Sequence, residues 1–155
     1  LLIGTAIILP AWQALLYIRF HQQGLALLFL MLLVIWSMDS GAYFAGRWWG
    51  KKPLAPQLSP KKTQEGCYGG ILLAGVVAAV YTYFAVGAAY FTPFFGVVLL
   101  TVMLLSILGD LVESMVKRLA EIKDSGKILP GHGGILDRLD SVFAAAPVFA
   151  FGLWL

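Results

Sequence analysis

The fold is decided by the stretch from Gly24 to Gly46, which reads GLALLFLMLLVIWSMDSGAYFAG. This stretch is 23 residues long and contains one charged side chain, Asp39. A helix of about 20 apolar residues is long enough to cross the hydrocarbon core of a lipid bilayer. The stretch is therefore predicted to form a membrane-spanning helix.

Four further apolar stretches repeat this pattern, at residues 1–18, 67–90, 93–109 and 141–155. The helix that starts at residue 93 is expected to continue past the bilayer through Leu111–Leu119. Apolar residues make up 60% of the sequence and charged residues 12%, whereas soluble domains carry about 25% charged residues. The predicted fold class is all-α, a polytopic transmembrane helical bundle with about five spans. Residues 1–155 are expected to form a single transmembrane catalytic domain, the C-terminal part of a longer protein with further N-terminal spans.

The charged residues indicate how these helices are oriented. Ten of the eleven Lys and Arg residues lie in two loops, after the second and fourth spans, and only Arg19 lies on the other side. All eight acidic residues lie at or near the same ends of the spans. Cytoplasmic loops are enriched in Lys and Arg, so both loops are predicted to be cytoplasmic. The low total charge argues against nucleic-acid binding, and the single cysteine, Cys67, excludes an internal disulfide and zinc sites built on several thiolates.

Several carboxylates near these helix ends are candidates for a functional site. Asp39 interrupts an apolar helix, where an ionised group is costly unless it is paired or faces water. Asp110 and Glu113 are three residues apart on one helical face, and Lys117 follows on the same face. Two interpretations of this face stay open: a surface ion pair between Glu113 and Lys117, or carboxylates that bind a divalent ion beside a cation for phosphate.

A glycine-rich loop from Lys123 to Gly134 precedes the last span and contains His132. Its glycines permit close backbone approach to a ligand and leave N–H groups free to bind anions, and His132 could donate to a phosphate. Asp137 and Asp140 follow, three residues apart. Magnesium is usually held by one or two carboxylates together with water and substrate phosphates. Asp110 with Asp137 would therefore be enough for a magnesium site.

Three segments of the chain carry a family pattern. The longest starts with SMVKR at residues 114–118, continues with KD at 123–124 and ends with HGGILDRLD at 132–140. The other two read DSGAYFAGR at residues 39–47 and SPKKTQEG at 59–66. Together these segments resemble the phosphatidate cytidylyltransferases (CDP-diacylglycerol synthases).

This resemblance implies transfer of CMP from CTP to phosphatidic acid, which gives CDP-diacylglycerol and pyrophosphate in phospholipid biosynthesis. It implies Mg²⁺ and a second, monovalent cation as cofactors, and a bacterial inner (plasma) membrane with the site on the cytoplasmic side. The implied metal ligands are Asp110, Asp137 and Glu113. The implied catalytic residues are Asp110, Asp137, Lys117, Arg118, Lys123, Asp124, His132 and Asp140. The implied substrate-binding residues are Asp39, Lys61, Lys62, Thr63 and Arg138.

Other functions stay open on the residues alone. The same carboxylates and cations would serve a CTP-dependent enzyme that acts on another lipid, such as an isoprenoid ether lipid cytidylyltransferase or a lipid-alcohol kinase. A membrane transporter or assembly subunit is a third alternative, although it predicts charges near mid-span on several helices rather than at one interface. Small residues over 69–79 could pack helices within one subunit or between two, so a homodimer also stays open.

Overall fold

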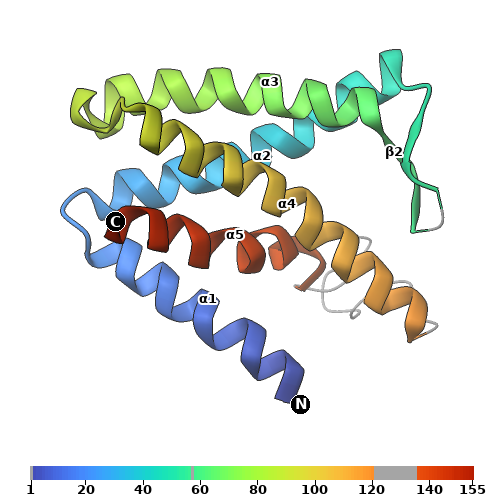
Figure 1. Cartoon of the computed structure of the whole chain (residues 1–155), viewed down its shortest axis with the longest axis horizontal. Coiled ribbons are helices and arrows are strands. Elements are labelled where there is room, and N and C mark those ends of the chain that lie inside the picture. Colours follow the sequence, from blue (N-terminus) through green and yellow to red (C-terminus); the bar gives the residue numbers. More distant parts are fainter. Residues whose placement is uncertain (1, 57, 121–135) are drawn as a thin grey trace.

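The computed structural model describes residues 2–56, 58–120 and 136–155, with the side chains of residues 2, 3, 60 and 136–138 outside that description. Five α-helices account for most of the described residues: α1 (Leu2–Phe20), α2 (Gly24–Trp49), α3 (Gln64–Tyr81), α4 (Pro93–Leu119) and α5 (Leu136–Trp154). The predicted helical bundle is confirmed (Figure 1). Three described helical segments are long and apolar enough to cross a membrane, Gly24–Trp49, Gln64–Val86 and Pro93–Leu119. The chain is a membrane protein.

Figure 1 shows how the five helices pack against one another. α2 packs along α3, α4 packs against α5, and α5 packs against α1. The reversals between α1 and α2 and between α3 and α4 lie at one end of the bundle, together with the C-terminus. The opposite end holds the last turns of α2 and α4 and the start of α3. The last turns of α2 and α4, which carry Arg47 and the pair Lys117 and Arg118, therefore lie at the same end of the bundle.

The turn between α3 and α4 ends the third span earlier than predicted. α3 continues as a π-helix, η1 (Thr82–Val86), and the chain then reverses through Gly87 and a 3₁₀-helix, η2 (Ala88–Tyr90). Gly87 has a φ of +119°, a conformation that other residues rarely adopt. The helical span therefore stops at Val86 rather than at the predicted residue 90. Conversely, α5 begins at Leu136, ahead of the predicted residue 141.

A two-stranded hairpin in the loop after α2 was not predicted from the sequence. β1 (Pro53–Ala55) pairs antiparallel with β2 (Ser59–Thr63), with Pro53 opposite Thr63. Strands this short show no clear hydropathy pattern, and a contact with the neighbouring helix α3 stabilises them. Thr63 Oγ1 caps α3 by accepting a hydrogen bond from the N–H of Gly66 at 3.1 Å. The hairpin therefore leads directly into α3, which fixes the position of β2.

Glycine lets α2 and α3 approach each other closely. A Cβ atom at Gly41 would lie 2.8 Å from the carbonyl oxygen of Gly69 and 2.9 Å from the Cα of Gly70. Neither distance leaves room for a side chain. Small residues at such crossings allow tight helix packing in membranes, where van der Waals contact replaces the hydrophobic effect as the driving force.

A second close crossing joins α4 to α5. A Cβ at Gly109 would lie 2.8 Å from the Cβ of Ala144. Next to this contact, the Ser141 hydroxyl donates a hydrogen bond to the carbonyl oxygen of Ser106 at 3.2 Å. Gly109 and the buried Ser141 together fix the position of α5 along α4, next to the acidic residues of both helices.

Candidate active site

An ion pair joins the hairpin to α4. Nζ of Lys62, on β2, contacts Oδ2 of Asp110, in the second half of α4. Each side chain is 32% exposed, so water reaches the pair. Oγ of Ser114, one turn further along α4, donates a hydrogen bond to Oδ1 of Asp110 at 3.5 Å. The two oxygens of Asp110 thus face two different donors.

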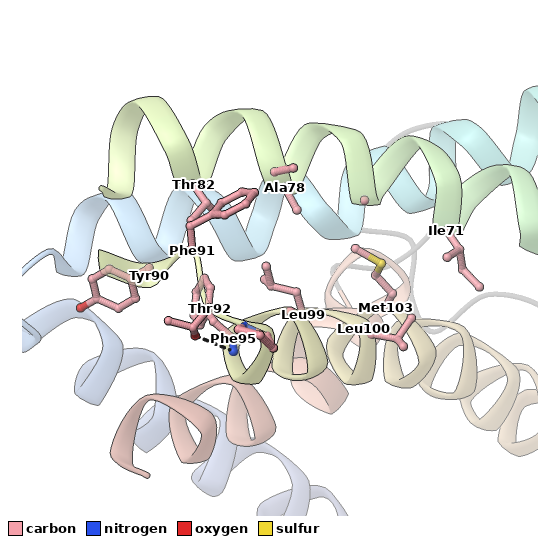
Figure 2. Close-up of a pocket in the computed structure, with 14 residues that line it drawn as sticks. Ile71, Ala78, Thr82, Tyr90, Phe91, Thr92, Phe95, Leu99, Leu100 and Met103 are labelled. Atoms are coloured by element: carbon pink, nitrogen blue, oxygen red, sulfur yellow. Dashed lines mark hydrogen bonds between the residues drawn. The ribbon is translucent and has the colours of Figure 1, made fainter. Parts of the chain in front are cut away.

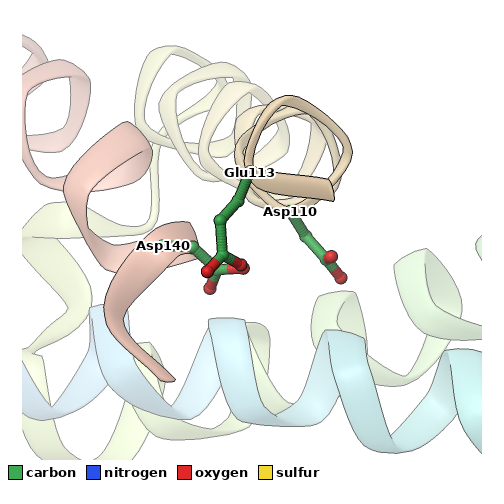
Figure 3. Close-up of side chains that lie close together, drawn as sticks. All are labelled: Asp110, Glu113 and Asp140. Carbon is green, nitrogen blue, oxygen red and sulfur yellow. The ribbon is translucent and has the colours of Figure 1, made fainter. Parts of the chain in front are cut away.

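Two more carboxylates form a cluster with Asp110 (Figure 3). One oxygen from each of Asp110, Glu113 and Asp140 lies within 4.8 Å of the other two. Figure 3 shows Glu113 and Asp140 meeting between α4 and α5, with Asp110 beside them. Gly109 permits this approach, because a Cβ there would lie only 3.1 Å from the carbonyl oxygen of Asp140. The backbone packing therefore brings the acidic residues together.

Asp39 adds a fourth carboxylate, from α2. It interacts electrostatically with Asp110, Lys62 and Asp140. An ionisable side chain in a membrane-spanning helix is costly unless it faces polar groups, and here it faces the cluster. The charge that interrupts the second apolar stretch thus belongs to the same polar region as the acidic residues of α4 and α5.

Lys117 supplies a second ammonium group. Its Nζ lies 3.4 Å from Oε2 of Glu113, and both side chains are mostly buried. The ion pair considered from the sequence is therefore present, yet Glu113 also belongs to the carboxylate cluster. Among the described residues, the four carboxylates face two ammonium groups, Lys62 and Lys117, so negative charge is in excess.

This donor set suits a divalent cation such as Mg²⁺. Magnesium binds oxygen ligands at about 2.0–2.1 Å in an octahedron, so opposite ligands are about 4 Å apart. The oxygens of Asp110, Glu113 and Asp140 span up to 4.8 Å, close to that value. Their excess negative charge favours a cation between them, and the partial exposure of the side chains leaves room for water ligands.

Three other expected site residues lie at the same end of the bundle. Thr63 has its hydroxyl oxygen engaged in the cap of α3. The side chains of Lys61 and Arg118 are exposed. Their roles toward a substrate stay predictions.

The remaining expected site residues fall outside the described part of the structure. This holds for Lys123, Asp124 and His132 as a whole and for the side chains of Asp137 and Arg138, whose backbone belongs to α5. The pairing of Asp110 with Asp137 in a metal site therefore stays a prediction.

Two structural roles were not predicted from the sequence. Lys62 was expected to bind a phosphate and Asp110 a metal, but the pairing of their side chains was not predicted. Nor was a role predicted for Glu65, whose Oε2 accepts hydrogen bonds from the backbone N–H groups of Lys51 and Lys52 at 3.1 and 3.2 Å. The first contact spans 48 positions, so no local pattern could indicate it. The only signal was that both loops were expected on one side of the membrane.

The fold and the cluster together define a class of protein. It is a polytopic membrane protein in which separate helix ends bring carboxylates and lysines together at one end of the bundle. The sequence pattern of the cytidylyltransferase family matches residues 1–155. The chain belongs to the cytidylyltransferase family.

Several similar proteins carry the name phosphatidate cytidylyltransferase. The one from Haemophilus influenzae is 45% identical over 139 residues, which cover 87% of this chain and 48% of the relative. The one from Bacillus subtilis is 50% identical over 132 residues, covering 84% and 48%. The one from Rickettsia bellii is 40% identical over 162 residues, covering 100% of this chain and 70% of the relative. The chain thus spans about half the length of the first two relatives.

Proposed function

We propose that the protein transfers the CMP unit of CTP to phosphatidic acid, giving CDP-diacylglycerol and pyrophosphate. The observation that carries this proposal is the cluster of Asp110, Glu113 and Asp140 beside Lys62. Family membership and the names of the relatives agree with it. An oxygen of the lipid phosphate attacks the α-phosphorus of CTP and forms a new P–O bond. The bond to the bridging oxygen of the β-phosphate breaks, and pyrophosphate leaves.

The reaction brings together anions only, so its main obstacle is electrostatic. Asp110, Glu113 and Asp140 would hold Mg²⁺, with Asp137 as a further ligand. Bound there, the ion would neutralise phosphate charge and stabilise the charge that develops on the leaving group. A second, monovalent cation would find excess negative charge near Asp39.

The lysines supply the second part of the charge neutralisation. Lys62 pairs with Asp110 in the structure, so a cation that binds Asp110 competes with the ammonium group of Lys62. Released from the carboxylate, Lys62 would hold a phosphate of CTP or of the lipid. Lys117 lies one turn after Glu113 on α4, and it would likewise hold a phosphate next to Glu113. Preorganised cations of this kind stabilise a transition state because they need no reorganisation during the reaction. Lys61, Arg118, Lys123 and Arg138 are proposed to add to this phosphate clamp.

The place of the reaction follows from the distribution of charge. The last turn of α2, the loop and hairpin that follow it, and the end of α4 carry most of the described basic residues and lie at one end of the bundle. The excess of Lys and Arg in cytoplasmic loops supports a site at the cytoplasmic face of a bacterial inner membrane. There the lipid headgroup and water-soluble CTP can meet.

The deciding experiment uses the purified full-length protein in detergent with phosphatidic acid and Mg²⁺. CTP labelled at the α-phosphate should transfer its label to lipid, with release of one pyrophosphate for each lipid labelled. CTP labelled at the γ-phosphate should transfer none. Label in the lipid from the γ-phosphate would instead show a lipid kinase. Omission of phosphatidic acid, or its replacement by an isoprenoid ether lipid phosphate, tests the identity of the acceptor.

A further inference from the structure

An apolar groove runs between α3 and α4 (Figure 2). Its volume is about 540 Å³, within the range of roughly 300–1,000 Å³ typical of ligand pockets. On the α4 side its wall includes Leu99 and Met103, and on the α3 side Ile71 and Ala78. Apart from the hydroxyls of Thr82, Tyr90 and Thr92, the lining side chains carry only apolar groups. The groove therefore suits a hydrocarbon chain.

Two glycines widen the groove without serving the packing of the chain. Gly75 of α3 and Gly96 of α4 line it, and a Cβ at either position would meet no described atom within 4 Å beyond its chain neighbours and the nearby backbone of its own helix. Gly41 and Gly109 are different, because a Cβ there would lie less than 3.0 Å from neighbouring atoms. Helix packing thus explains Gly41 and Gly109 but not Gly75 and Gly96, which leave space open along the groove.

The wall of the groove also contains an unpaired polar atom. Thr82 is only 2% exposed, and its Oγ1 has no hydrogen-bond partner among the described residues. It lines the groove at the start of η1. Buried hydroxyl groups normally have a partner. An acyl chain has no group that could pair with it, so the apolar remainder of the wall, and not this hydroxyl, favours a hydrocarbon occupant.

The end of the groove at Met103 is the part of it that lies nearest the acidic cluster along α4. On α4, Gly96, Met103 and Asp110 follow one another at intervals of seven residues, a spacing that keeps them on one helical face. At about 1.5 Å per residue, Met103 lies about 10 Å along the helix from Asp110. On the α3 side, β2 carries Lys62 to Asp110 just before the helix begins.

The apolar groove and the ion pair beyond it together are complementary to one kind of molecule. The groove is apolar, and about 10 Å beyond Met103 along α4 the ammonium group of Lys62 contacts Asp110. An amphiphile with an anionic phosphate at one end and a hydrocarbon chain at the other is complementary to both parts. A lipid of the inner leaflet would also lie in this direction, because its headgroup is at the interface and its chains extend along the membrane normal.

We propose that the groove between α3 and α4 binds an acyl chain of the lipid substrate while the lipid phosphate lies at the Lys62–Asp110 pair. This inference rests on the proposed function. The groove would align the phosphate for attack and make the reaction depend on acyl-chain length. Leucine at Gly75 or Gly96 would fill the space that the chain occupies.

The test compares Gly96→Leu and Gly75→Leu with Gly4→Leu in the full-length protein. Gly4 lies in α1, away from the groove, and a Cβ there also meets nothing within 4 Å, so it is a matched control. Leucine has a higher helix propensity than glycine, so all three variants should fold. Each protein is assayed with dioctanoyl and with dioleoyl phosphatidic acid in mixed micelles.

We expect the ratio of kcat/KM for the long-chain lipid to that for the short-chain lipid to fall about tenfold or more in both groove variants, the size of effect seen when a few methylene groups lose their pocket. Gly4→Leu should keep the wild-type ratio. An unchanged ratio in active groove variants would overturn the proposal. A wild-type protein inactive with every lipid would instead contradict the proposed function.

A second readout does not depend on turnover. Phosphatidic acid with a photoreactive diazirine near the end of one acyl chain should label α3 and α4 at groove residues, and the labelling should be lost in Gly96→Leu. Labelling elsewhere in the protein would overturn the proposal. So would a change of oligomeric state in the groove variants with an unchanged chain-length ratio, since it would show that a second copy covers the groove.

Discussion

Lys62 Nζ and Asp110 Oδ2 form an ion pair although 48 positions separate the two residues in the chain. The contact joins β2, which precedes α3, to the second half of α4, and it places an ammonium group on a carboxylate of the acidic cluster. An ammonium group and a divalent cation compete for that carboxylate. Binding of a cation at Asp110 and binding of a phosphate at Lys62 therefore affect each other through this ion pair.

The variant Lys62→Gln tests this linkage. It should lower kcat/KM for CTP about a hundredfold, because one preorganised charge of the phosphate site is lost. It should also lower the Mg²⁺ concentration that gives half-maximal activity, since nothing then competes for Asp110. Steady-state kinetics over a Mg²⁺ titration measure both effects. Lys51→Gln, which removes an exposed lysine from the same loop, should change neither. Wild-type kinetics in Lys62→Gln would limit the lysine to a structural role.

Glu113→Gln and Asp140→Asn test the carboxylate cluster. Each change keeps the shape of the side chain and removes its charge, so Mg²⁺ should bind about 10–100-fold more weakly. Binding of Mn²⁺, followed by electron paramagnetic resonance, reports this without turnover. The control is Thr101→Val, because Thr101 lies on α4 and bonds only to the backbone of its own helix among the contacts described. If both carboxamide variants bound Mn²⁺ like the wild type, the cluster would not be the metal site.

The variant Asp137→Asn tests whether Asp137 or Asp140 of α5 contributes more to the metal site. We expect it to abolish turnover while the protein remains folded and inserted in the membrane, as measured by thermal unfolding and membrane fractionation. Comparison with Asp140→Asn ranks the two positions. Near-normal CTP-dependent activity in Asp137→Asn would remove that residue from the metal site.

The close crossing of α4 and α5 gives a prediction about stability. In Gly109→Leu the new side chain would meet Ala144 and the backbone of Asp140 at less than normal contact distance. Overpacking of this kind costs about 1–3 kcal/mol, and the displacement of α5 would weaken Mn²⁺ binding as well. Gly4→Leu, at a position with open space, should keep both the unfolding temperature and the Mn²⁺ affinity. A Gly109→Leu protein that matched this control would show that the crossing can relax without cost.

The sequence by itself determined the membrane-spanning helices and the end of the bundle at which the charges gather. Hydropathy and charge are properties of a continuous stretch, so they can be recognised without knowledge of the neighbours. The stretch from Gly24 to Gly46 falls entirely within α2, and the helix that starts at residue 93 continues to Leu119 as expected. Some helix limits differed: the backbone at Gly87 ends the third span at Val86, and α5 begins at Leu136.

Tertiary structure alone decided which of these charges meet. Asp140 reaches Asp110 and Glu113 because Gly109 lets α5 approach α4, and Lys62 reaches Asp110 because a hairpin too short for a hydropathy signal holds it there. The open groove beside Gly75 and Gly96 is likewise a relation between two helices. Such contacts depend on the distance and rotation between helices, which are set by shape complementarity across the whole bundle rather than by any single segment.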